Sequence, residues 1–293
     1  MNLALTVLEI TAPVFILAAV GFAWVKAGFE YRVEFVTRLA MTLSVPCLIF
    51  TALMKTQIDP QALTTLSVAA AAAYGLLSIV AWALVKLTRL DVRTFLAPII
   101  FGNTGNLGLP LAMFAFGEVG LGYAVVVFAV MAIWSFTFGV WLVAGGGSLT
   151  KVVKEPLVGA TLLGGLFLWQ GWHTPVFLTN ALQLIGQMAI PIMLITLGVA
   201  VARMTPGHVG RALWISALKL VLCFGLTWGV GVWFELDKTA FAVLVLQLST
   251  PVAVTSYLLA EKYGADAESV AGLVVVSTLM SVAAIPLMLA VLL

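Results

Sequence analysis

The chain has 293 residues, of which 63% are hydrophobic and 9% are charged, and its formal net charge at pH 7 is +2. Soluble domains average roughly 45–50% apolar and about 25% charged residues, so this composition excludes a soluble protein and indicates an integral membrane protein throughout. A net charge this small gives no sign of a nucleic-acid partner. The two cysteines, Cys47 and Cys223, fall within apolar segments, where they are expected to act as small buried hydrophobes.

Apolar segments of membrane-spanning length follow one another along the whole chain. At about 20 residues per span, we predict an all-α integral membrane protein with ten transmembrane helices. In chain order the spans cover residues 5–25, 35–53, 63–87, 95–116, 121–143, 156–172, 177–202, 213–234, 241–260 and 270–293.

The first span sets the predicted orientation. No Lys or Arg precedes it and Lys26 follows it, so it is not expected to be a cleaved signal peptide. With the N-terminus outside, only Lys55 and Lys238 fall in outer loops, which is a strong positive-inside signal. We therefore predict a multi-pass protein of the cell (inner) membrane with both termini on the outer side. The residues then placed at the cytoplasmic side are Lys26, Arg32, Arg38, Lys86, Arg89, Arg93, Lys151, Lys154, Arg203, Arg211 and Lys262.

The fourth and ninth spans are each interrupted near the middle. The fourth contains Gly102-Asn-Thr-Gly-Asn-Leu-Gly-Leu-Pro110, and the ninth contains Gln247-Leu-Ser-Thr-Pro-Val-Ala-Val-Thr-Ser256. Amide side chains, glycines and prolines are costly at membrane depth unless the broken backbone lines a polar cavity, because lipid offers no hydrogen-bond partner. A matched pair of interrupted helices is typical of a secondary transporter with its substrate site at the bilayer midplane.

The two halves of the chain also match each other in order and motif. Pro46 precedes Pro191 by 145 positions in similar surroundings, and Gly117 precedes Gly264 by 147. Each half would hold five spans with the broken span fourth, and an odd number of spans requires the second half to be inverted. We predict repeats at 1–143 and 155–293 whose broken helices cross, joined by a short flexible linker at 144–154.

Amide side chains in the first interruption are the leading candidates for contact with an anion. Asn103 and Asn106 can donate hydrogen bonds to a carboxylate without adding a fixed charge. Helix N-termini at a break also carry unpaired N–H groups and roughly half a positive charge each. Two roles stay open for both residues, substrate contact or capping of the freed backbone, and Gly105 is placed beside them in the predicted site. The backbone of the crossing is predicted to be shaped by Gly102, Gly108, Pro110 and Pro251.

Further polar residues of the second half complete the predicted substrate site, although the hydroxyls would equally satisfy the broken backbone. Lys219 lies roughly 9 Å deep at 1.5 Å per residue, where it either snorkels to the cytoplasmic interface or faces the cavity. Glu9 is equally shallow from the outer side and is either interfacial or, like Lys219, a candidate for ion coupling. The predicted ligands from this half are Gln247, Ser249, Thr250, Thr255 and Lys219.

Enzymatic and ATP-driven functions lack their usual residues. The aspartates fall in or beside loops, so no intramembrane carboxylate pair is expected, and the sequence contains neither a His-Glu-x-x-His zinc motif nor a phosphate-binding P-loop. We expect no cofactor and no metal site. The alternative of a membrane enzyme or receptor without transport is accordingly weak.

At Gly102 to Pro110, followed by Leu-Ala-Met-Phe-Ala-Phe-Gly117, the chain resembles the auxin efflux carrier family, whose bacterial members include malonate and malate permeases. Ser249-Thr-Pro-Val-Ala-Val-Thr-Ser-Tyr-Leu-Leu-Ala-Glu-Lys-Tyr-Gly264 and Val274-Val-Val-Ser-Thr-Leu-Met-Ser281 extend the likeness over essentially the whole chain. The resemblance implies the ten-helix inverted-repeat fold of the bile acid–sodium symporter group. It also implies a scaffold of helices 1, 2, 6 and 7, a moving transport unit of helices 3–5 and 8–10, and contact between Asn103 and a substrate carboxylate.

Together these features predict a secondary transporter of small organic anions, such as malonate, malate or auxin-like acids, working by alternating access. The crossing lacks the acidic residues that a sodium site of the bile acid group would require, which argues against sodium coupling. The alternative is a sodium- or proton-coupled symporter of larger amphipathic organic acids. The expected partners are the organic anion, the lipid bilayer and a second copy of the chain through the scaffold helices.

Overall fold

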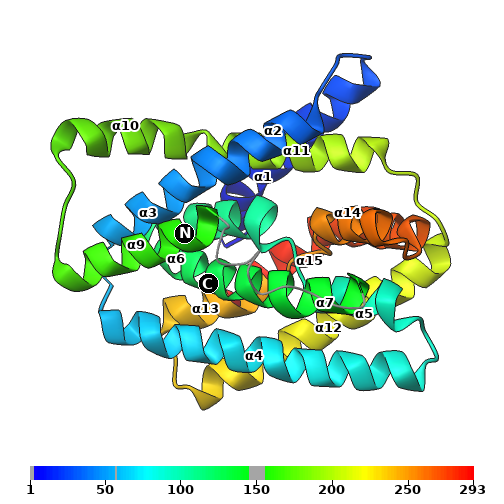
Figure 1. Ribbon diagram of the computed structural model, residues 1–293. Helices are drawn as coiled ribbons and strands as arrows, with labels where there is room; N and C mark the ends of the chain where they lie inside the picture. Colours follow the sequence, from blue (N-terminus) through cyan, green and yellow to red (C-terminus); the bar gives the residue numbers. More distant parts are fainter. Residues whose placement is uncertain (1–2, 57, 145–155) are drawn as a thin grey trace.

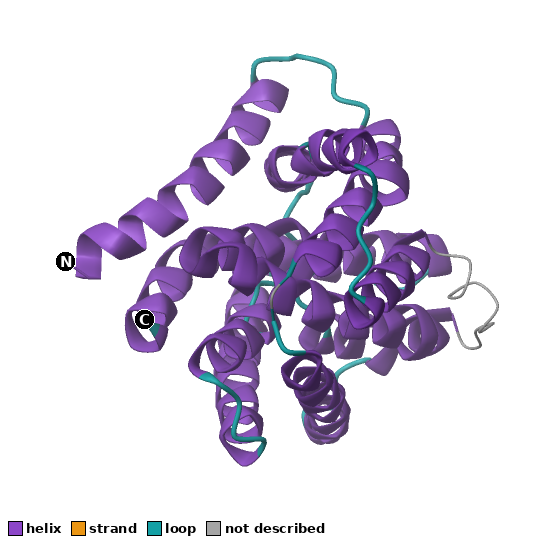
Figure 2. Ribbon diagram, turned by 90° about the vertical axis from the view of Figure 1, so that its left-hand side faces the viewer, coloured by secondary structure: helices purple, strands orange, loops and turns teal. Residues whose placement is uncertain are grey.

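The computed structural model describes residues 3–56, 58–144 and 156–293. In this part of the chain, helices are joined by loops, and the one β-type contact is an isolated bridge (Figure 2). Residues 145–154 of the predicted linker lie outside the described residues. The elements are α1 (Leu3–Lys26), α2 (Val33–Leu39), η1 (Ala40–Ser44), α3 (Val45–Lys55), α4 (Pro60–Leu87), α5 (Val92–Ile100), η2 (Thr104–Gly108), α6 (Leu109–Trp134), η3 (Ser135–Gly139), α7 (Val140–Ala144), α9 (Pro156–Gln170), α10 (Val176–Gln187), α11 (Ala189–Arg203), α12 (Val209–Trp233), α13 (Lys238–Leu248), α14 (Val254–Tyr263) and α15 (Ala267–Leu292).

Seven helices of the described chain are long and apolar enough to cross a membrane, and two shorter apolar helices, Pro156–Gln170 and Lys238–Leu248, accompany them. The all-helical membrane class is therefore confirmed. One of the seven, Thr104–Val143, has 40 residues, which at 1.5 Å per residue is about twice the thickness of a bilayer core. Gly117 (φ 63°, ψ −153°) divides it, so the end of the broken fourth segment is separated from the fifth.

Aspartate side chains mark where helices begin. Each aspartate of the described chain accepts a backbone N–H at a helix N-terminus, which satisfies donors that have no partner within the helix. Two hydrogen bonds from Ser269, the stronger influence from its side chain and the weaker from its backbone N–H, lower the pKa of the Asp266 carboxyl group. The sequence placed these carboxylates at loops, and their role there is capping. The capped helices are α4 by Asp59, α5 by Asp91, α13 by Asp237 and α15 by Asp266.

The matched prolines lie at corresponding irregularities. Pro46 follows the π-helical turn η1 between α2 and α3, and Pro191 follows the junction at Met188 between α10 and α11. Proline cannot donate the backbone hydrogen bond of a regular helix, and π-bulges commonly accommodate such defects. The second and seventh predicted spans are thus both irregular just before a proline.

Left-handed backbone conformations also recur along the chain. Six residues with positive φ form three pairs separated by 143 to 147 positions, and each lies just after the end of a helical stretch. His208 is the remaining positive-φ residue of the described chain and has no counterpart. The pairs are Gly28 with Gly171, Arg89 with Glu235, and Gly117 with Gly264.

The helices pack in two groups. In one, α1 packs on α11, and α3 packs on α9 and α10. In the other, α4 packs on α5 and α6, and α12 packs on α4, α13 and α15. Figure 1 shows α10, α2 and α11 along the top of the view and α4 and α12 along the bottom. The first and last helices, α1 and α15, also pack together, and the two ends of the chain lie near each other.

The closest helix contact of the first group depends on glycine. A Cβ atom on Gly198 of α11 would overlap the backbone carbonyl of Ala18 in α1, and one on Gly21 would overlap the carbonyl of Ile195. Backbone atoms cannot move aside as a flexible side chain can. Small residues at such crossings let two helices approach closely in a membrane.

We therefore expect Gly198→Ala to destabilise the protein by about 1–3 kcal/mol, the usual cost of overpacking. Gly229→Ala on α12 is the matched control, because a Cβ there meets nothing within 4 Å and the same substitution should be neutral or slightly stabilising. Thermal unfolding of the two purified variants in detergent checks this. Equal melting temperatures for Gly198→Ala and the wild type would contradict the close contact.

Candidate functional site

The two interrupted helices meet and cross at their unwound segments. Gly102 and Val252 form an antiparallel bridge. On either side, the Asn103 N–H donates to the Pro251 carbonyl at 2.7 Å, and the Ala253 N–H donates to the Phe101 carbonyl at 3.2 Å. These bonds satisfy backbone groups that the breaks would otherwise leave unpaired in the membrane.

Glycine is required at the centre of this crossing. A Cβ atom on Gly102 would overlap Oγ1 of Thr250, and one on Gly108 would overlap the side-chain amide of Gln247. The glycines that the sequence assigned to the crossover backbone therefore lie where the two segments approach most closely. Pro110 lies just after the π-helical turn η2, which continues into α6, and such turns commonly accommodate the backbone hydrogen bond that proline cannot donate.

Two helix N-termini converge on one cavity of about 250 Å³ beside the crossing. One is the start of η2 at Thr104, which continues into α6, and the other is the start of α14 at Val254. The first N–H groups of each helix have no acceptor within it, and each end carries roughly half a positive charge. The cavity is lined by Met41, Gly102, Asn103, Gly105, Asn106, Phe128, Met131, Ala132, Ser135, Leu157, Met193, Ala253, Val254, Thr255, Leu258 and Leu259.

Asn103 lines this cavity, and its side-chain amide nitrogen is buried and unpaired. The residue is 5% exposed, its Nδ2 has no hydrogen-bond partner, and its side chain makes no capping bond to η2. Its backbone is fully used instead, because the carbonyl accepts from the N–H groups of Leu107 and Gly108. A buried unpaired amide costs free energy unless a ligand satisfies it. The structure therefore shows no side-chain capping by Asn103 and leaves its Nδ2 donor without a partner.

A second cavity of about 250 Å³ adjoins the first through shared lining residues that include Asn106, Met193 and Thr255. It extends to Arg203, whose guanidinium donates to the Tyr31 carbonyl at 2.6 Å. Methionine, leucine, valine and alanine side chains make up much of the wall of both cavities, and the second cavity also has threonines and Arg203. The pair forms an apolar passage from the crossing toward the end of the molecule that carries Arg203.

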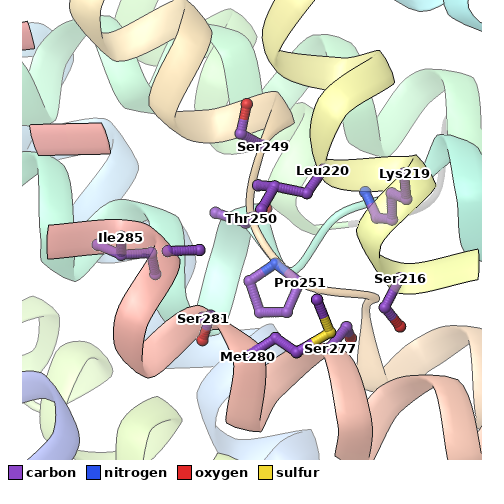
Figure 3. Close-up of a pocket in the computed structure, with 11 residues that line it drawn as sticks. Ser216, Lys219, Leu220, Ser249, Thr250, Pro251, Ser277, Met280, Ser281 and Ile285 are labelled. Atoms are coloured by element: carbon purple, nitrogen blue, oxygen red, sulfur yellow. The ribbon is translucent and has the colours of Figure 1, made fainter. Parts of the chain in front are cut away.

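Three other predicted ligands lie elsewhere. Lys219, Ser249 and Thr250 line a small hollow of about 20 Å³ that shares no lining residue with the larger cavity (Figure 3). Thr250 Oγ1 donates to the carbonyl of Gln247 at 2.7 Å, so it satisfies the end of α13. Of the predicted substrate ligands, the structure thus brings Asn103, Asn106, Gly105 and Thr255 together and separates these three from them.

Gln247 and Glu9 line none of the cavities described. Gln247 is fully buried, and its amide lies against Gly108 without a hydrogen-bond partner, because α13 directs it between the crossing helices. Glu9 is exposed on the surface of α1. Neither residue is in contact with the cavity beside Asn103.

Some residues at the crossing were not predicted from the sequence to have a role there. Ser277 of α15 accepts a hydrogen bond from the Val252 N–H at 3.0 Å and so supports the second unwound segment. Ser281 lies one turn further along, beside the same hollow. The sequence signal that could have identified these two serines is a pair of hydroxyls spaced four residues apart in an otherwise apolar span. The apolar wall residues Phe128 and Met193 had no such signal, because they resemble any other core residue.

Comparison with known proteins places the chain among transporters. A family model described as "Membrane transport protein" matches residues 6–152 and 144–289. An uncharacterized transporter of Methanothermobacter thermautotrophicus is 28% identical over 191 residues, which cover 63% of each chain. A Rhizobium meliloti protein named "Putative malonate transporter" is 25% identical over 202 residues, and an uncharacterized transporter of Methanocaldococcus jannaschii is 24% identical over 214.

These similarities cover less than two thirds of the relatives. The matches include 63% of this chain and 62% of the Rhizobium protein, and 64% of each chain for the Methanocaldococcus protein. The matched family and relatives are membrane transporters rather than enzymes. Their descriptions agree with the resemblance that the two crossover motifs carry.

Proposed function

The chain belongs to the membrane transport protein family, and we propose that it is a secondary carrier of small organic anions that binds its substrate at the helix crossing. The observation that carries this proposal is that Asn103, whose buried Nδ2 has no hydrogen-bond partner, lines a cavity on which two helix N-termini converge. Such a site donates hydrogen bonds and partial positive charge without a fixed cation among its lining residues. A carboxylate such as malonate, malate or an auxin-like acid matches that chemistry.

Within this site, Asn103 and Asn106 bind the carboxylate, and the backbone N–H groups near Gly105 and Thr255 complete the ring of donors. Anions are favoured at helix N-termini because unpaired N–H groups and the helix dipole act together. The apolar walls hold the remainder of the substrate. Release of the carboxylate toward either side then requires only that the crossing be exposed there.

The carrier works by alternating access between two inverted five-helix repeats that together make ten spans. The scaffold consists of α1, α2–α3, α9 and α10–α11, and the remaining helices form the transport unit with the crossing. Support comes from the antiparallel pairing at Gly102, from the recurrence of positive-φ residues, and from the two packing groups of helices. We place the protein in the inner membrane with both termini outside, as a homodimer through the scaffold.

A second candidate substrate class is favoured by the adjoining cavity. Two connected cavities of about 250 Å³ each, with mainly apolar walls, offer more room than a three- or four-carbon diacid needs. A larger amphipathic acid would place its carboxylate at Asn103 and its apolar body along the passage. This is the sodium- or proton-coupled symporter alternative.

Uptake by proteoliposomes tests the proposal and separates the candidates. Vesicles containing the purified protein are offered labelled malonate, malate or indole acetate, and protein-free vesicles measure passive leakage. We expect saturable, protein-dependent flux of at least one of these carboxylates. Flux of none of them, despite correctly folded protein, would refute the proposed function.

A further inference from the structure

The hollow behind the crossing is lined by a buried lysine. Lys219 is 3% exposed and lies ten residues after the start of α12, about 15 Å along the helix at 1.5 Å per residue. Its amino group therefore does not reach an interface by snorkelling. Figure 3 shows the side chain pointing from α12 toward the segment that carries Thr250 and Pro251.

No carboxylate accompanies this amino group. The residues that line the hollow include no Asp or Glu, and the ion pairs of the described chain join only Glu30 with Arg32 and Glu34 with Arg38. Hydroxyl groups surround the hollow instead. Those of Ser216 and Ser249 are buried and have no hydrogen-bond partner. Taking a charge out of water without an opposite charge is expensive, so such an arrangement is seldom kept for stability alone.

The position of the amino group matches the negative ends of the broken helices. The first halves, α5 and α13, end at Ile100 and Leu248, and a helix C-terminus carries roughly half a negative charge. Lys219 Nζ lies 3.7 Å from Cys223 Sγ, which in turn lies 4.0 Å from the Ile99 carbonyl oxygen. The helix dipoles therefore give the two sides of the crossing opposite partial charges: positive helix N-termini lie at the large cavity, and negative helix C-termini lie toward Lys219.

We propose that the Lys219 ammonium is a built-in counter-charge for the transported anion and takes the place of a bound coupling cation. This inference rests on the proposed function. In a low-dielectric interior, charges interact far more strongly than in water. An anion at Asn103 is compensated by the ammonium across the unwound segments, so no sodium ion is needed to fill the hollow. Lys219 is thus a positioning residue that acts on the substrate through the crossing.

Chemical rescue provides the test, with malonate as the probe in sodium-free choline buffer. Lys219→Ala removes the charge and leaves a void. We expect malonate affinity to fall at least tenfold and to recover when methylammonium is added, because that ion fits the void. Tetramethylammonium, which is too large, should restore nothing. Asn103→Ala is the control, since its loss of affinity should not respond to methylammonium.

Lys219→Met covers the case in which the alanine variant does not fold, because methionine fills the space without the charge. It should bind malonate at least tenfold more weakly and show no rescue, whereas Lys219→Arg should retain more affinity. Wild-type affinity in folded Lys219→Met, or a sodium requirement in the wild type, would overturn the inference while leaving anion transport standing. Failure of the wild type to bind any carboxylate would overturn both.

Discussion

Asn103→Ala is expected to weaken malonate binding about ten- to a hundredfold, because removal of a buried donor to an anion typically costs about 1.5–3 kcal/mol. The free protein should tolerate the change. Nδ2 of Asn103 has no partner, and its side chain makes no capping bond, so the substitution removes an unsatisfied group rather than a native interaction. Melting temperature without ligand should be unchanged or slightly raised, while the stabilisation by saturating malonate falls by about 1.4–2.7 kcal/mol.

Asn180→Ala is the matched control for this experiment. Asn180 lies exposed on α10, and the substitution removes the same amide from a surface remote from the crossing. Thermal shift against malonate concentration, measured for both variants and the wild type, gives the affinities. A stable Asn103→Ala protein with wild-type affinity would refute substrate contact. A variant that unfolds without ligand would instead favour a structural role for the amide.

Transport is expected to follow the membrane potential and to persist without sodium and without a pH gradient. The lining of the large cavity contains no Asp or Glu that could bind a coupling ion. One elementary charge crossing 100 mV is worth about 2.3 kcal/mol, which corresponds to a roughly fiftyfold gradient of a monovalent anion at equilibrium. A cytoplasm-negative potential therefore drives such an anion outward. A fixed ammonium at Lys219 does not alter this balance, because it returns to its starting place in every cycle.

Flux in liposomes under a potassium–valinomycin potential measures this dependence. Sodium and pH are varied independently at constant voltage, and the sign of the potential is then reversed. We expect reversal to change the direction of net anion accumulation, and replacement of sodium by choline to have no effect. Flux that stops whenever one ion gradient is removed, whatever the voltage, would identify a coupled symporter.

The sequence was sufficient to identify the membrane class, the interrupted segments and the transporter family. Each of these depends on residues close together along the chain. An apolar run predicts a span, and Gly102, Asn103 or Pro251 within such a run signals a break, because lipid cannot satisfy the backbone there. The transporter family is confirmed by the family match. The inverted repeat and the direction of insertion stay predictions.

Only the tertiary structure decided which predicted ligands face one another. Within a regular helix the 3.6-residue period tells which side chains share a face, but an unwound segment has no such period. Antiparallel pairing of Gly102 with Val252 therefore determined that Asn103 and Thr255 line one cavity while Ser249 and Thr250 line another.

The burial of Lys219 likewise came from packing. The depth of Lys219 in the sequence allowed either a snorkelling or an inward-facing side chain. The structure buries it at a hollow that α12 lines together with α15 and the segment after α13. Gln247 was directed between the crossing helices for the same reason, by contact with Gly108. Local sequence determines whether a segment forms a regular helix or a break. The contacts of each polar side chain are determined by the segment across the crossing, which is distant along the chain.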